Sequence, residues 1–247
     1  MLTATLFDFY GTLVEVPREG ARQTIKSWFE IIKTKKDGIT LQEAARSATK
    51  LWDDYSLGEI QSDRDYVEKF LEKIEIAKNE DLINLLLETW VARGLFVVYP
   101  QTNAVINEIK KLGLKIGIIS DSPPPWFKKH MTQSGIESLV NATVVSGEVN
   151  VKKPDAQIYI KALEKLQSKA SEVVFVSDAP SDLMGAHKVG IKELILVSPP
   201  VKTYRVGERV KGKFKEKFME YEELEIRPTV VKNLEEVPNV IRGLLKS

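Results

Sequence analysis

Short apolar segments alternate with helical patterns through most of the second half of this chain. Each apolar segment is followed by residues with the spacing of an amphipathic helix. Strands that alternate with helices form parallel sheets whose two faces are covered. The pattern therefore predicts an α/β fold with a Rossmann-like parallel sheet core and helices on both faces. The expected strands are 4–9, 115–119, 142–145, 173–176 and 194–197.

A long helical block interrupts this alternation after the first expected strand. Helical periodicity runs from about residue 17 to 94 and includes no strand pattern. Thr40 and Ser62 are the residue types that cap helix N-termini, and they divide the block into separate helices. We therefore predict a small all-α domain at 17–94, inserted into a core that consists of 1–16 and 95–247.

Residues 201–225 form an unusually charged segment. Lys and Arg dominate 201–217, and Glu follows in 218–225. Apolar residues alternate with charged ones, which predicts a solvated, self-neutralising β-hairpin inserted into the core. A patch for nucleic acid or an acidic ligand is the alternative interpretation.

Charge and composition exclude several functional classes. The 36 basic and 35 acidic residues leave a net charge of +1, so no overall field attracts nucleic acid. No apolar run approaches the ~20 residues that a membrane-spanning helix needs. The chain has no Cys, which excludes disulfides and thiolate chemistry. Without a basic segment before the first apolar run we expect no signal peptide and a cytoplasmic location.

The chain has two histidines. We expect His130 at the surface and a structural role for His187.

Chemically reactive side chains gather where the expected strands end. The carboxyl ends of parallel strands meet at one edge of a sheet, and ligands bind there in open α/β folds. A single acid at such a position is usually a helix cap, but a set that spans four strand ends indicates an active site. The set comprises Asp8, Ser120, Asp121, Lys153, Ser177, Asp178 and Asp182.

These motifs resemble those of the haloacid dehalogenase-like (HAD) hydrolase superfamily. LFDFYGTLV at 6–14 resembles its first motif and IIS at 118–120 its second. Lys153 with Pro154 resembles the third motif, and VSDAPSD at 176–182 the fourth. The resemblance covers essentially the whole chain. It implies that the block at 17–94 is an α-helical cap, which closes over the site and sets substrate specificity.

Each position then has a chemical role. Asp8 is the expected nucleophile, which forms a covalent intermediate. Backbone amides of the turn Phe9–Gly11–Thr12 hold the anionic part of the substrate. Ser120 donates a hydroxyl, and Lys153 offsets the negative charge of nucleophile and substrate.

Magnesium is the expected cofactor. Mg²⁺ is typically bound by one or two carboxylates, several waters and a substrate phosphate. Asp8, the backbone carbonyl of Tyr10 and Asp178 are the expected ligands, and Asp182 either supports this site or is the N-terminal acid of the next helix.

Residue 10 separates two chemistries within the superfamily. Most of its phosphatases have Asp at this position as general acid and base, whereas its 2-haloacid dehalogenases have Tyr, as this chain does. The unperturbed pKa of Tyr is about 10, so it is a poor base near neutral pH. Four further residues also match the dehalogenase pattern, namely Ser120, Lys153, Tyr159 and Ser177.

Two acidic residues oppose the dehalogenase interpretation. Asp121 and Asp178 replace neutral residues of the dehalogenases, and their charge would repel a carboxylate substrate and a departing halide unless a cation is bound. A dehalogenase also needs a cap arginine, for which Arg22 and Arg46 are the candidates.

The leading interpretation is a Mg²⁺-dependent phosphatase of small phosphorylated metabolites, which acts through an aspartyl-phosphate on Asp8. A metal-independent 2-haloacid dehalogenase that forms an aspartyl ester is the second. The third is a non-catalytic binding protein on the same scaffold. In each case we expect a small anionic ligand as partner, with neither nucleic acid nor membrane.

Overall fold

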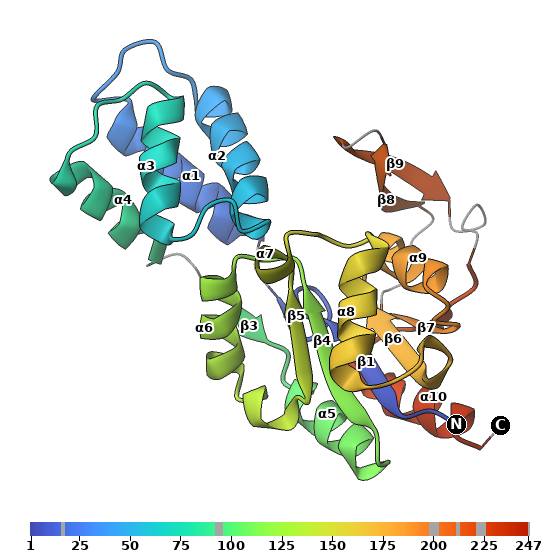
Figure 1. The fold of residues 1–247 in the computed structure, drawn as a ribbon. Coiled ribbons are helices and arrows are strands. Elements are labelled where there is room, and N and C mark those ends of the chain that lie inside the picture. The colour runs from blue at the N-terminus through green and yellow to red at the C-terminus, as the bar shows by residue number, and fades with distance from the viewer. Residues whose placement is uncertain (16–17, 92–95, 198–202, 211–212, 221–225, 247) are drawn as a thin grey trace.

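A six-stranded parallel sheet forms the core of the computed structural model, which describes residues 1–15, 18–91, 96–197, 203–210, 213–220 and 226–246. The strand order is β10-β7-β6-β1-β4-β5 (Figure 1). The predicted Rossmann-like α/β fold is confirmed. The strands are β1 (Ala4–Asp8), β4 (Lys115–Ser120), β5 (Ala142–Val145), β6 (Val173–Ser177), β7 (Glu193–Val197) and β10 (Thr229–Val231).

Helices cover both faces of this sheet and bury two separate apolar clusters. In β1 the fully buried Phe7 belongs to one cluster and Leu6 to the other, as the alternation of strand side chains requires. On the Phe7 side lie α5 (Thr102–Lys111), α6 (Pro124–Ser134) and α10 (Val237–Leu244), and on the Leu6 side lie α8 (Ala156–Leu166) and α9 (Pro180–Lys188).

The position of β1 in the sheet determines where the site lies. β1 pairs with β4 on one side and β6 on the other, and Asp8 is in register with Ile119. The polar residues that end these three strands therefore meet at one edge of the sheet. The short helix α7 (Ser146–Val149) follows β5 at the same edge.

A helical bundle lies at the end of the core opposite the two chain termini (Figure 1). It contains α1 (Arg18–Ile32), α2 (Leu41–Ser56), α3 (Asp63–Lys73) and α4 (Glu80–Val91), and it has an apolar cluster of its own. The predicted caps are confirmed. Thr40 and Glu43 form a capping box before α2, and the Ser62 hydroxyl accepts the Asp65 N–H before α3 at 3.1 Å. The expected boundaries near 17 and 94 lie outside the described residues.

Two further strand pairs lie outside the main sheet. β2 (Val14–Glu15) pairs antiparallel with β3 (Val97–Val98), where the chain leaves the core for the bundle and returns to it. Two-residue strands are too short to give an alternating pattern, so the sequence did not predict them. β8 (Thr203–Val210) and β9 (Lys213–Glu220) form an antiparallel pair within the charged segment, whose other residues are outside the described ranges.

Among the described residues, no helix has the length and apolar character needed to cross a membrane.

Candidate active site

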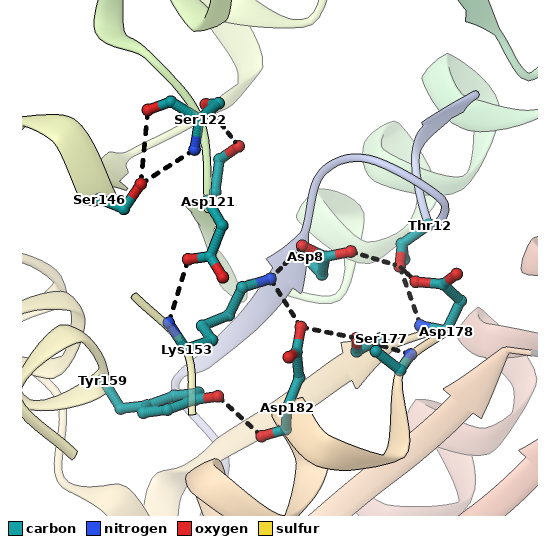
Figure 2. Close-up of polar contacts among 12 residues, drawn as sticks. Asp8, Thr12, Asp121, Ser122, Ser146, Lys153, Tyr159, Ser177, Asp178 and Asp182 are labelled. Carbon is teal, nitrogen blue, oxygen red and sulfur yellow. Dashed lines mark hydrogen bonds and ion pairs between the residues drawn. The ribbon is translucent and has the colours of Figure 1, made fainter. Parts of the chain in front are cut away.

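The loop that follows β1 brings two carboxylates together. Thr12 Oγ1 lies 3.1 Å from Asp8 Oδ2 and 3.3 Å from Asp178 Oδ1, and it accepts the Asp178 N–H at 3.0 Å (Figure 2). A single hydroxyl proton is thus shared between two acids. Gly11 makes this approach possible because its φ is +93° and a Cβ there would lie 2.5 Å from Asp178 Oδ2.

Lys153 joins a second pair of carboxylates. Its ammonium contacts Asp8 Oδ1 and lies 2.6 Å from Asp182 Oδ2, and the lysine is only 6% exposed. Its backbone N–H donates to Asp121 at 3.1 Å (Figure 2). Burial by itself lowers the pKa of Lys153, but Asp182, Asp8 and Asp121 outweigh this and hold the pKa well above its ordinary value. Lys153 is therefore a permanent cation.

The carboxylates remain in excess over this one cation. Burial raises the pKa of Asp8, Lys153 opposes the rise and Asp182 adds to it. Burial, then Asp8 and Asp182, raise the pKa of Asp178 to about 7. Burial also raises the pKa of Asp121 to about 7. These four acids share the charge of Lys153, so the site stabilises either extra protons or an added cation.

The expected metal ligands divide into two groups. Asp8 and Asp178 meet at Thr12, whereas Asp182 pairs with Lys153 and accepts the Ser177 hydroxyl at 3.3 Å. Within the described ranges, no group of three or more His, Asp or Glu side chains is arranged to hold a metal ion. Two carboxylates that face each other are nevertheless a donor set that suits Mg²⁺, which usually keeps several waters. The residues present fit that ion at Asp8 and Asp178.

Tyr10 turns its phenol toward α6 of the core. Its Oη lies 2.8 Å from Nδ1 of His130, and its ring packs edge-on against Phe9 at 4.9 Å between centroids. Burial raises the pKa of Tyr10 above its ordinary value of 10.0, and a hydrogen bond with Ser122 only partly offsets this. The phenol is therefore protonated at neutral pH.

The expectation that His130 lies at the surface is wrong, because the residue is 2% exposed. It lies on the buried face of α6 with Phe127, Met131 and Ser134. The three-, four- and seven-residue spacing of these positions is the sequence signal that could have identified it.

Two serines that the sequence analysis did not select connect the site to the bundle. Ser120 Oγ lies 2.9 Å from Ser122 Oγ, and the Ser122 N–H donates to Ser146 Oγ at 3.0 Å. Ser146 Oγ in turn donates to the backbone carbonyl of Ser56, the last residue of α2, at 2.5 Å. Only their position at strand ends could have indicated them, because these partners are distant in sequence.

Tyr159 and Ser177, expected to contact substrate, both contact Asp182. The buried Tyr159 hydroxyl donates to the Asp182 carbonyl at 2.8 Å. Ser177 also accepts the Ala179 N–H at 3.1 Å, which closes the turn before α9. Both residues therefore hold the start of α9, which carries the carboxylate that faces Lys153.

An aromatic contact joins the bundle to α6 beside Tyr10. The Trp126 indole donates to Asp63 of α3 at 2.7 Å, and the Tyr55 hydroxyl donates to the same oxygen at 2.8 Å. Trp126 also packs against Trp90 of the bundle at 5.2 Å and against His130 at 5.6 Å. The bundle is thus attached to α6 next to His130, the partner of Tyr10.

Comparisons with known proteins agree on a family and differ on chemistry. The family model for haloacid dehalogenase-like hydrolases matches residues 2–190. A phosphoglycolate phosphatase of Yersinia pestis is 32% identical over 47% of this chain, which spans about half the length (49%) of that relative. A glyceraldehyde 3-phosphate phosphatase of Methanocaldococcus jannaschii is 25% identical over the full length of both chains.

The fold is also found in a solved dehalogenase. The crystal structure of a 2-haloacid dehalogenase from Pseudomonas syringae pv. Tomato DC3000 superposes with a TM-score of 0.70 and covers 99% of this chain and 100% of its own. At 18% identity this likeness shows a shared fold alone.

Proposed function

We propose that this chain, which belongs to the haloacid dehalogenase-like hydrolase family, is a Mg²⁺-dependent phosphatase of small phosphorylated metabolites. The observation that carries this proposal is Asp178, a carboxylate beside Asp8 whose pKa is raised to about 7 by burial and neighbouring acids. No Lys or Arg of the described residues forms an ion pair with it. A bound divalent cation would offset the repulsion between two such carboxylates. The two phosphatase relatives support the same chemistry.

The residues of the site supply a nucleophile and donors for a phosphoryl group. A carboxylate oxygen of Asp8 attacks phosphorus, the bond from phosphorus to the leaving oxygen breaks, and its electron pair departs with the leaving group. Water then attacks phosphorus and the bond to Asp8 breaks, which releases phosphate and restores the carboxylate. Ser120, Lys153 and the backbone of the loop 9–12 hold the phosphoryl oxygens. Bound Mg²⁺ would neutralise the phosphoryl charge and both carboxylates.

Residue 10 limits the substrates that this site handles well. The pKa of the Tyr10 phenol is raised by burial, so it is a weak acid for the leaving group. We therefore expect aryl and acyl phosphates, whose leaving groups depart as stable anions, to react faster than alkyl phosphates. The bundle 18–91 acts as the cap in this proposal and excludes water from the site. Equal rates for an alkyl phosphate and p-nitrophenyl phosphate would contradict the preference.

A 2-haloacid dehalogenase is the second candidate, and Tyr10 favours it. In that reaction Asp8 attacks carbon, halide leaves with the electron pair, and no acid is needed. Arg22 and Arg46, the candidates for a halide-binding arginine, are both exposed. We rank this function second because both arginines are exposed and because, among the described residues, Asp178 has no Lys or Arg in ion-pair contact. A non-catalytic binding protein remains the third candidate, again because of Tyr10.

A paired assay separates these functions. Phosphate release from p-nitrophenyl phosphate and chloride release from L-2-chloropropionate are measured with Mg²⁺ and with EDTA, and Asp8→Asn serves as the blank. We expect phosphate release that requires Mg²⁺ and is abolished in the variant. Chloride release that EDTA leaves unchanged would refute the phosphatase. Binding of phosphate or Mg²⁺ without turnover of either substrate would favour the binding protein.

A further inference from the structure

His130 is a buried imidazole, and one of its two nitrogens has a hydrogen-bond partner among the residues that the structure describes. Its ring stacks on Phe96 at 4.3 Å between centroids, with 23° between the ring planes. Nδ1 lies 2.8 Å from Tyr10 Oη. Nε2 is buried and has no hydrogen-bond partner among the described residues. Within the described ranges the ring therefore has a single hydrogen bond, and its partner is the residue that distinguishes the site from most phosphatases of the family.

This arrangement has a stability cost that packing alone does not justify. Burial, with a smaller effect from Lys129, lowers the pKa of His130 to about 4, so the ring is neutral near pH 7. A buried donor or acceptor left unpaired costs about 1–3 kcal/mol. A phenylalanine would stack on Phe96 and fill the same space without that cost. The benefit of the imidazole therefore lies at Nδ1.

The direction of the hydrogen bond follows from the neighbouring hydroxyls. Ser120 and Ser122 are linked at 2.9 Å. The Ser122 hydroxyl lowers the pKa of the Tyr10 phenol, an effect smaller than that of burial, which is the effect of a hydroxyl that donates toward the phenol oxygen. If each hydroxyl donates its one proton to the next group, the sequence Ser120, Ser122, Tyr10 ends at a nitrogen that must accept. Nδ1 of His130 meets this need when its proton is on Nε2. In the other tautomer Tyr10 would accept two hydrogen bonds and its own proton would need a further acceptor.

We infer that His130 is a positioning and specificity-determining residue. Its Nδ1 accepts a hydrogen bond from the Tyr10 hydroxyl, and this bond prevents Tyr10 from protonating a leaving group. This inference rests on the proposed phosphatase function and deepens it. In this arrangement the lone pairs of the Tyr10 oxygen face the serines, and its hydroxyl hydrogen points to Nδ1 of His130 on α6. The substrates are therefore restricted to phosphate esters and anhydrides whose leaving groups need no proton.

The histidine tautomer gives a test that does not depend on activity. The chain has two histidines, so ¹⁵N-labelled His gives two sets of ring signals, which His130→Phe assigns. We expect a neutral His130 ring with the proton on Nε2 and a Nδ1 signal that shifts in Tyr10→Phe. A proton on Nδ1 would overturn the inference, and so would a Nδ1 signal that is indifferent to Tyr10→Phe.

The leaving-group dependence tests the consequence for catalysis. The readout is the ratio of kcat/KM for an alkyl phosphate to that for p-nitrophenyl phosphate. His130→Phe keeps the ring stack on Phe96 but removes the acceptor of the Tyr10 hydroxyl, which is then free to donate to a leaving group. We therefore expect this ratio to rise about 3- to 10-fold, which is less than the rate increase that a general acid of matched pKa provides. His130→Asn retains a side-chain oxygen as acceptor and is expected to restore the wild-type ratio.

A double-mutant cycle completes the test. If His130 acts through the phenol, His130→Phe leaves the ratio unchanged when Tyr10 is already Phe. The same change in both backgrounds would overturn the inference, because a structural effect of His130 does not need the hydroxyl. A wild-type protein that hydrolyses no phosphate ester would instead refute the proposed function and the leaving-group role with it, and the tautomer measurement would still decide the hydrogen bond.

Discussion

Replacing Asp178 with Asn removes the charge at this position and keeps its shape. The amide retains an oxygen for the Thr12 hydroxyl, and the backbone N–H that donates to Thr12 is unchanged. What is lost is the negative charge beside Asp8. We therefore expect the variant to be more stable than the wild type when Mg²⁺ is absent, and to lose the stabilisation that Mg²⁺ gives.

The size of the effect follows from the electrostatics of the site. Burial and the acids Asp8 and Asp182 raise the pKa of Asp178 from 3.8 to about 7. The folded state thus binds this proton more tightly than the unfolded state, so folding stability is lost as pH rises from about 4 to about 7. A rise in pKa from 3.8 to about 7, at about 1.36 kcal/mol for each pKa unit, sets an upper limit of about 4 kcal/mol on the folding stability that is lost. Because the neighbouring acids share this cost, we expect a gain of roughly 1–3 kcal/mol from Asn.

Urea denaturation at several pH values, in EDTA and in Mg²⁺, measures both effects. Asp178→Asn should exceed the wild type in unfolding free energy at pH 8 in EDTA, and the difference should vanish near pH 4. Mg²⁺ at 100 times its Kd should stabilise the wild type by about 2.7 kcal/mol and leave the variant unchanged. Asp37→Asn is the matched control, because Asp37 is exposed.

One result would refute this reasoning directly. If the wild type and Asp178→Asn had the same stability at every pH, and Mg²⁺ stabilised neither, then the charge of Asp178 would be neither costly nor matched by a cation. The argument for magnesium chemistry at Asp8 would fail with it.

Three further predictions test other contacts of the structure. Gly11→Ala places a Cβ 2.5 Å from a carboxylate oxygen of Asp178, at a backbone φ of +93°. Gly113→Ala is its control, because Gly113 has a similar φ of +85° but no atom within 4 Å of the added Cβ. Denaturation curves should show a loss of about 1–2 kcal/mol in unfolding free energy for Gly113→Ala and a larger loss for Gly11→Ala. Tyr159→Phe leaves a backbone carbonyl without its donor at 2.8 Å, so thermal unfolding should show a loss of about 1–3 kcal/mol while the Mg²⁺ response persists. Asp63→Ala removes the acceptor 2.7 Å from the Trp126 indole, and we expect a red shift of tryptophan emission that is absent when Trp126 is Phe.

The sheet could be predicted from sequence because its periodicity reflects burial. Every residue of β1 and of β6 is buried, and such strands give continuous apolar runs. The β2–β3 pair has no comparable signal, because each strand has only two residues. These strands pair where the chain leaves the core and returns to it, and two residues are too few to form a recognisable apolar face. Helix caps such as Thr40 were predictable because a cap is a local interaction, made within three residues.

The site was predictable in its position and not in its contacts. Parallel topology forces the ends of β1, β4 and β6 to one edge, so residues at these ends had to gather. Which acid faces which partner depends on the loop between β6 and α9, where Asp178 turns to Thr12, and on the first turn of α9, where Asp182 turns to Lys153. The partnership of Tyr10 with His130 spans 120 residues and depends on how α6 packs, which no local pattern encodes.

The excess of carboxylates has a consequence that holds for either chemistry. Within the described part of the chain, Lys153 forms ion pairs with Asp8 and Asp182, and neither Asp121 nor Asp178 has a Lys or Arg side chain in ion-pair contact. Four buried or half-buried acids thus share one lysine, so an anionic substrate enters a site that already repels it. Protonation or a bound cation must offset that repulsion before a phosphate or a haloacid can approach Asp8. A dehalogenase on this chain would therefore need protons at Asp121 and Asp178, and its activity should fall as pH rises through about 7. A phosphatase whose cation supplies the charge should keep its activity above that pH. The pH profile of chloride release in EDTA, compared with that of phosphate release in Mg²⁺, thus separates the two reactions without reference to residue 10.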